Sequence, residues 1–189
     1  IVDGQILYHP KTPQRGEVTA DGYLDITKVP ARSKRMRQIR GGEIALIPQE
    51  PMSAFSPLHT VGSQLVEAIT LHRDVGRREA RQIAIDSLRD VGIPNPEQRV
   101  DAYSWQLSGG LRQRAIIAMA LACNPKVLIA DEPTTAVDVT TQAQILDLIK
   151  RLQHEHNSSI LFITHDLGVI AQLVDDVVVM YLGKVMEQG

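Results

Sequence analysis

The sequence predicts an α/β fold in which a mostly parallel sheet is flanked by helices, with a helical segment inserted into the chain. The first observation is that short apolar runs alternate with segments of helical periodicity from residue 108 onward. This alternation is typical of parallel strands joined by helices that cover the sheet. The second is that residues 51–105 contain helical patterns and no run with the character of a strand.

Length and composition fit this class. The chain has 189 residues, which suffices for one domain with a sizeable core, and 43% of them are hydrophobic. The formal net charge of −2 gives no general attraction to nucleic acid, so no nucleic-acid partner is expected. Cys123 is the only cysteine, which excludes a disulfide framework, and its apolar helical surroundings predict a buried thiol.

No segment of the sequence predicts a membrane span. The longest apolar run, Ala115–Cys123, is far too short to cross a bilayer. The first residues lack the basic and apolar segments of a signal peptide. We therefore expect a cytosolic protein whose contact with a membrane is made through partners.

Three elements are expected in the first fifty residues. Asp21-Gly22 is a strong hairpin turn signal between short extended stretches in residues 16–27. A short polar helix is expected over residues 32–40, followed by the apolar strand Glu43–Ile47, which Pro48 closes. The helix carries basic residues that are expected to form a solvated face: Arg32, Lys34, Arg35, Arg37 and Arg40.

The inserted segment and the later α/β part are both periodic. The insert holds two expected helices, Val61–Leu71 and Arg77–Val91, and Gly92 and Pro94 end the second. That second helix has an apolar face made of Ala80, Ile83, Ala84, Leu88 and Val91. Later helices are expected at 108–122, 140–153 and 167–173, and strands at 126–130, 160–164 and 176–181, with 184–188 pairing back onto the last strand.

Two acids stand at the end of one expected strand. Ligands of parallel sheets collect at the carboxyl ends of strands, where Asp131 and Glu132 follow the apolar run Val127–Ala130. The run is either a buried strand that ends in a solvated acidic turn or part of a phosphoryl-transfer site. In such a site Asp131 helps to hold Mg²⁺, and Glu132 orients or deprotonates the water that attacks the γ-phosphate.

A serine and two glycines open the expected helix over residues 108–122. Ser108, Gly109 and Gly110 are either an N-cap with a flexible turn or an anion site. In an anion site the helix-start amides point at a phosphate, and glycine allows close approach of the backbone. The segment Arg112–Arg114 follows, with the acidic strand end beyond it, and this combination favours the anion site.

Three further polar residues complete the candidate set. Gln49 follows the strand that ends at Ile47, where a glutamine is ordinarily a surface loop residue. His165 follows the expected strand over 160–164 and falls at the same sheet edge as Glu132, although a lone histidine at a strand end is usually structural. Asp138 is an N-cap candidate for the next helix, and that role is compatible with a place in the site.

In this order and spacing, these residues resemble the nucleotide-binding domain of ABC transporters over essentially the whole chain. Leu107–Gly110 is similar to the signature motif of that family, and Val127–Glu132 is similar to its Walker B motif. Gln49 falls at the Q-loop glutamine, Ala136-Val137-Asp138 at the D-loop, and His165 at the switch histidine. The fold implied is P-loop NTPase-like, with an ABC helical subdomain inserted.

Three segments resemble, more narrowly, the branch of importers for oligopeptides and dipeptides, nickel and glutathione: Pro48–Val61, Arg112–Leu121 and Ala130–Leu148. The function implied is the ATP-binding subunit of an importer, in which hydrolysis at a head-to-tail cassette dimer drives uptake at the cytoplasmic face of the bacterial inner membrane. The implied partners are a second ABC ATPase subunit, identical or paralogous, two membrane permease subunits that contact the inserted helices and, indirectly, a periplasmic solute-binding protein.

The resemblance also implies ATP and Mg²⁺ as cofactors and a role for each candidate residue. Glu132, His165 and Gln49 are implied as catalytic, and Gln49 and Asp131 as metal contacts. Ser108 and Gly110 are implied to touch the ATP of the partner subunit. The full set implied in nucleotide binding is Ser108, Gly109, Gly110, Gln113, Asp131 and Asp138.

One motif of the family has no match in the sequence. No segment reads G-x-x-x-x-G-K-[S/T], the phosphate-binding Walker A motif. The chain is therefore expected to be a partial ATPase domain, inactive alone, that begins after the Walker A helix and stops before the C-terminal extension of the family. Residues 1–50 and about 115–189 are expected to form its core lobe, and about 51–114 a helical subdomain that ends in the signature motif.

Two other functions deserve comparison. ABC-type ATPases of DNA repair or translation, which are soluble, usually carry a coiled coil, a zinc module or a second cassette, whereas the insert here is short and free of cysteine. A non-catalytic ABC subunit that only lends its signature loop typically lacks the Walker B glutamate or the switch histidine. Glu132 and His165 are both present, so both comparisons favour the importer ATPase.

Overall fold

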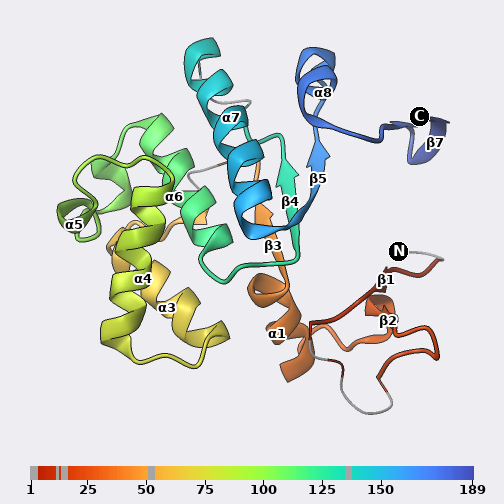
Figure 1. Ribbon diagram of the computed structural model, residues 1–189, viewed down its shortest axis with the longest axis horizontal. Coiled ribbons are helices and arrows are strands. Elements are labelled where there is room, and N and C mark those ends of the chain that lie inside the picture. The colour runs from red at the N-terminus through yellow and green to blue at the C-terminus, as the bar shows by residue number, and fades with distance from the viewer. Residues whose placement is uncertain (1–3, 12, 14–16, 51–53, 135–137) are drawn as a thin grey trace.

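A three-stranded parallel sheet lies at the centre of the chain (Figure 1). The computed structural model describes residues 4–11, 13, 17–50, 54–134 and 138–189. The strands run in the order β3 (Ile44–Ile47), β4 (Val127–Asp131) and β5 (Ser159–Ile163). Each lies within one or two residues of its expected position, so the predicted α/β class with a parallel sheet is confirmed.

Two helices cover one face of this sheet. They are α6 (Gly109–Leu121) and α7 (Val139–His156), which lie on the same side of the sheet (Figure 1). The helices pack on side chains that alternate strand residues direct toward them. Those strand residues, all buried, are Ala45, Ile47, Leu128 and Ala130. The helix α7 turns its predicted apolar face, made of Ile145, Leu148, Ile149 and Leu152, into the same core.

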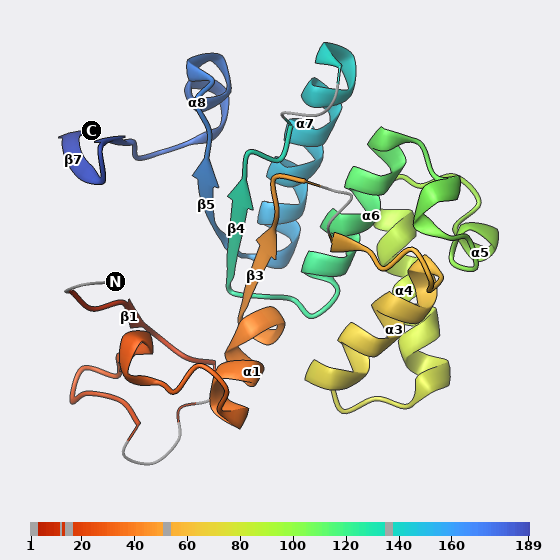
Figure 2. The same cartoon turned by 180° about the vertical axis from the view of Figure 1, so that it is seen from behind.

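The other face of the sheet is apolar and open in the described part of the chain (Figure 2). Leu46, Ile129 and Leu161 lie in register across the three strands. Of these, Leu46 is 55% exposed and Leu161 is 56% exposed, and Ile163 further along β5 is 45% exposed. The sequence pattern predicts a sheet covered on both faces, whereas the described helices cover one.

The inserted segment is helical, as predicted. It contains α3 (Val61–His72), α4 (Arg77–Asp90), the short α5 (Pro96–Arg99) and a 3-10 turn over Ser104–Gln106. On α4 the side chains of Ala80, Ala84 and Leu88 are fully buried, which confirms the predicted face. Gly92, with φ of +75°, ends that helix region in a conformation that glycine adopts readily.

The chain after β5 follows its predicted course. The helix α8 spans Leu167–Leu173, and β6 (Val178–Tyr181) pairs antiparallel with β7 (Lys184–Gln188) through Gly183. Cys123 is buried as expected, and burial raises the pKa of its thiol. Among the described helices, none combines the length and the apolar character that a bilayer crossing requires.

The N-terminal hairpin differs from its prediction. The strand β1 (Leu7–Tyr8) pairs antiparallel with β2 (Leu24–Asp25), so the partner of the second strand lies well before residue 16. The predicted turn does form, because the amide of Gly22 donates to the carbonyl of Thr19 and Gly22 has a φ of +79°. A short 3-10 turn over Ile26–Lys28 then leads to α1 (Lys34–Gly42).

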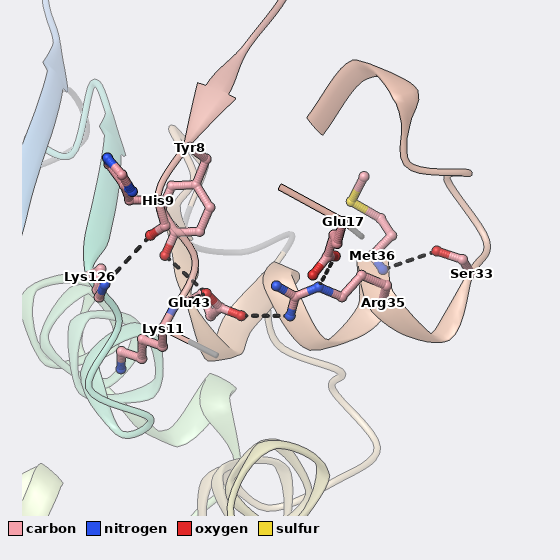
Figure 3. A network of polar contacts seen from close by, with 9 residues as sticks. All are labelled: Tyr8, His9, Lys11, Glu17, Ser33, Arg35, Met36, Glu43 and Lys126. Atoms are coloured by element: carbon pink, nitrogen blue, oxygen red, sulfur yellow. Dashed lines mark hydrogen bonds and ion pairs between the residues drawn. The ribbon is translucent and has the colours of Figure 1, made fainter. Parts of the chain in front are cut away.

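A buried carboxylate ties this hairpin to α1 and β3 (Figure 3). Glu43 is only 7% exposed and accepts hydrogen bonds from Tyr8 Oη at 3.2 Å, the amide of Lys11 at 2.7 Å and Arg35 Nη1 at 2.9 Å. Burial, and then the Glu43 carboxylate, raise the pKa of Tyr8 well above its ordinary value, so its hydroxyl stays protonated and donates. Arg35 also pairs with Glu17. The expectation that Arg35 belongs to a solvated face is therefore wrong.

We expect Arg35→Ala to lower the free energy of unfolding by about 3 kcal/mol, because the substitution leaves the buried Glu43 carboxylate without its cation. The matched control is Arg37→Ala, which removes an exposed arginine from the same helix and should change stability by less than about 0.5 kcal/mol. Urea unfolding followed by circular dichroism measures both. Equal changes in the free energy of unfolding for the two substitutions would show that the ion pairs of Arg35 do not stabilise the fold.

Candidate functional site

The backbone turns sharply where β4 ends. Glu132 follows Asp131 directly and has a φ of +43°. This value lies in the left-handed region, which residues other than glycine and asparagine rarely adopt. The amide of Glu132 donates to the carbonyl of Ile163 at 2.9 Å, which fixes the turn against the end of β5. Such backbone strain is often found at functional sites, where the surrounding structure maintains it.

Three of the predicted side chains meet at this turn. Gln49 Nε2 donates to Glu132 Oε2 at 2.9 Å, and His165 Nδ1 lies 3.0 Å from Glu132 Oε1. The three residues follow the carboxyl ends of β3, β4 and β5, so the order of the strands brings them together. The Glu132 side chain is 22% exposed and that of His165 is 74% exposed, so the carboxylate can be reached from solvent.

Asp131 supplies a second carboxylate beside Glu132. It is partly buried and lies in register with Ile163, on the open face of the sheet. Among the described residues, no three His, Cys, Asp or Glu side chains converge to hold a metal ion by themselves. The neighbouring oxygen donors are Asp131, Glu132 and the amide of Gln49. This donor set fits Mg²⁺, which is usually held by one or two carboxylates together with phosphate oxygens and water.

The loop before α6 presents amides at a helix start. Ser108 is the N-cap, and its side chain accepts from the amide of Leu111 at 3.4 Å. Gly109 has nothing within 4 Å of the place where a Cβ would stand, so the approach to the first turn is open. A Cβ on Gly110 would lie 3.1 Å from Thr141 Cγ2, so this loop packs against the start of α7. Unpaired amides there can bind an anion.

Gln113 is turned into the protein. It is 1% exposed, and its Nε2 donates to the carbonyl of Pro133 at 2.7 Å. The prediction that Gln113 binds nucleotide assumes a side chain that faces the site, whereas burial places this amide behind the loop that follows Glu132. Its position therefore favours a supporting role over direct contact with a nucleotide.

Asp138 is the N-cap of α7, as one of its two predicted roles requires. Its carboxylate accepts from Thr141 Oγ1 at 2.7 Å and from the amide of Thr141 at 3.0 Å. These bonds lower the pKa of Asp138 below its ordinary value. Ala136 and Val137, which complete the predicted D-loop, lie outside the described residues.

The predicted residues thus form two neighbouring groups. One is centred on Glu132, and the other joins the loop before α6 to the start of α7. Sequence reasoning missed Pro133, which links the groups through Gln113, because no local pattern signals a bond between a helix and a distant carbonyl. It also missed Asp166, which caps α8 and accepts from Gln142 Nε2 at 3.3 Å. An aspartate directly before an apolar helix could have revealed that cap.

Polar side chains gathered at the carboxyl edge of a parallel sheet, beside a helix start with two glycines, are an arrangement that phosphate-binding α/β proteins use. The chain belongs to the ABC transporter family, whose model matches residues 5–135. The predicted family is confirmed.

Curated relatives and solved structures agree with this membership. The chain is 51% identical over 176 residues to the oligopeptide transport ATP-binding protein OppD of Bacillus subtilis, covering 93% of the chain and 48% of OppD. It is 53% identical over 156 residues to the oligopeptide transport ATP-binding protein AmiE of Streptococcus pneumoniae, covering 82% of the chain and 44% of AmiE. The chain thus spans about half the length of these relatives.

One solved structure is similar over most of the chain. It is the ATP-binding cassette MJ0796, in a dimeric structure of a post-hydrolysis state bound to ADP and phosphate. The TM-score is 0.75 with 26% sequence identity, and the match covers 88% of this chain and 69% of that one.

Proposed function

We propose that the complete protein is the ATP-hydrolysing subunit of an ABC importer for peptides, or for nickel- or glutathione-like solutes. The single observation that carries the ATPase role is the Glu132 carboxylate, held between Gln49 and His165 at the carboxyl edge of the sheet. The similarity to OppD and AmiE, both named as oligopeptide transport ATP-binding proteins, supports the solute class.

Each residue of the site has a role in this proposal. Glu132 orients the attacking water and accepts its proton, since its carboxylate is accessible and fixed by two neighbours. Gln49 holds the second carboxylate oxygen and stands two residues before the inserted segment in the sequence. His165 is exposed enough to meet the γ-phosphate while it contacts Glu132.

The proposed cofactors are ATP and magnesium. When bound with ATP, Mg²⁺ neutralises charge that develops on the transferred phosphoryl group. Asp131 and Gln49 are the proposed metal contacts, because both stand at the strand ends beside Glu132. Asp138 is proposed to lie near the nucleotide from the first turn of α7.

The proposed assembly pairs two cassettes head to tail, identical or paralogous. Ser108, Gly109 and Gly110 then offer the α6 helix start to the ATP of the partner cassette, as the open space at Gly109 allows. The dimeric state of the similar MJ0796 cassette supports the pairing.

Residues 1–50 and about 115–189 are the proposed core lobe. Residues from about 51 to 114 are the proposed helical subdomain, which contacts two permease subunits.

The transport role places the protein at the cytoplasmic face of the bacterial inner membrane, where a periplasmic solute-binding protein delivers the solute to the permeases. We expect a strain that lacks the gene to lose uptake of labelled short peptides, nickel or glutathione. Wild-type gene should restore uptake, and a Glu132→Gln gene should not. A deletion strain that imports all of these solutes normally but fails to import a sugar or a lipid would contradict the proposed solute class.

A further inference from the structure

Gln113 is a buried polar residue in the middle of an apolar helix. It stands on α6 one helical turn after Gly109 and Gly110, and Ile116 and Ile117 on the same helix are buried in the core. Its Nε2 donates to the carbonyl of Pro133 at 2.7 Å. Its Oε1 is buried and has no hydrogen-bond partner in the described part of the chain.

That unpaired oxygen argues against a role in packing alone. A buried acceptor without a partner is unfavourable, and an apolar side chain of similar size would fill the same space without this cost. The amide group of Gln113 therefore contributes something that packing of α6 does not require, and its one described bond is to Pro133.

Pro133 is the residue directly after Glu132. Proline has no amide hydrogen, so its carbonyl is the one main-chain polar group by which the loop can be held at this position. On the other side of the turn, the amide of Glu132 is bonded to Ile163. Two hydrogen bonds thus flank the left-handed backbone of Glu132. Its own amide donates to the carbonyl of Ile163, and the carbonyl of the next residue, Pro133, accepts from Gln113.

We infer that Gln113 is a positioning residue that joins the α6 helix start to the carboxylate of Glu132 in the same chain. The inference rests on the proposed function, in which that helix start contacts the ATP of the partner cassette. A shift of Ser108–Gly110 on binding the partner's ATP moves α6, and Gln113 passes the movement through Pro133 to Glu132. The state of one nucleotide site thereby sets the geometry of the other.

The first test is Gln113→Met in the complete protein, assembled with its partner subunits. Methionine fills a similar volume but cannot donate to the Pro133 carbonyl. We expect the kcat of ATP hydrolysis to fall about tenfold or more while the KM for ATP changes by less than about twofold, because positioning affects the reacting carboxylate and not ATP binding. The Hill coefficient for ATP should also fall. The control is Ile117→Met, a buried substitution on the same helix that removes no hydrogen bond and should leave kcat unchanged.

The second test is Gln113→Glu across a range of pH. A protonated carboxyl can donate to the Pro133 carbonyl, whereas an ionised one repels it, and burial raises the pKa of a carboxyl group. The ratio of variant kcat to wild-type kcat should therefore fall as the pH rises from about 6 to about 9. A purely structural role gives no reason for such a trend.

The outcomes separate this inference from the proposed function. If the wild-type assembly hydrolyses no ATP, the proposed function fails, and the inference fails with it. If the wild type hydrolyses ATP and Gln113→Met keeps its kcat and Hill coefficient, the inference alone is wrong. Equal losses of kcat and of melting temperature in Gln113→Met and Ile117→Met would also overturn it, because packing would then explain both.

Discussion

Glu132→Gln in the complete protein should reduce ATP turnover by at least about 100-fold while ATP still binds. The substitution keeps the size of the side chain and an oxygen that can accept from Gln49 or His165, but it removes the carboxylate that takes a proton from water. The contacts to phosphate are unchanged, so the variant should accumulate as an ATP-bound dimer. Steady-state phosphate release measures turnover, and gel filtration with ATP measures the dimer.

The control for this substitution is Glu79→Gln. Glu79 is an exposed acid in the first turn of α4, away from the strand ends. We expect wild-type turnover from this variant, since the loss of one surface charge has no bearing on the reacting water. Hydrolysis by Glu132→Gln within about threefold of wild type would contradict the role assigned to Glu132.

The 189-residue chain on its own should show no measurable ATP turnover and no tight ATP binding. Its sequence contains no G-x-x-x-x-G-K-[S/T] loop, which in other phosphate-binding proteins surrounds the β- and γ-phosphates with amides, a lysine and a hydroxyl. The α6 helix start offers only a few amides and the hydroxyl of Ser108. Asp131 and Gln49 alone give Mg²⁺ too few ligands for tight binding.

Isothermal titration calorimetry with Mg-ATP and a phosphate-release assay at millimolar Mg-ATP test this expectation. Glu132→Gln in the same 189-residue chain is the control for contaminating ATPases. Micromolar affinity in the chain, or turnover that disappears in the Glu132→Gln control, would show that the described residues bind and use ATP without a Walker A loop.

Much of the fold could be predicted because it depends on local periodicity. The bounds of α8 match those expected, and α3, α4 and β4 begin or end within one residue of their expected limits. In each of these elements the spacing of the apolar residues indicates which face of the helix or strand is buried. The convergence of Gln49, Glu132 and His165 could also be predicted, because parallel strands bring their carboxyl ends to one edge.

The remaining features depend on contacts that local sequence patterns do not reveal. The pairing of β1 with β2, the burial of Arg35 beside Glu43 and the inward turn of Gln113 each join residues whose sequence neighbours give no sign of the partner. An arginine in a basic helix and a glutamine after a glycine-rich turn suggest exposed residues by composition. Tertiary packing decides otherwise, because both side chains meet buried acceptors.

The left-handed backbone at Glu132 implies a trade-off between stability and activity. Glycine or asparagine would adopt its φ of +43° more easily, so a chain selected for stability alone would carry one of them at this position. The glutamate gives up some folding free energy in return for a carboxylate at the strand end. A stabilising substitution is therefore available at position 132 itself, but under the proposed function it would remove the carboxylate that acts on the attacking water.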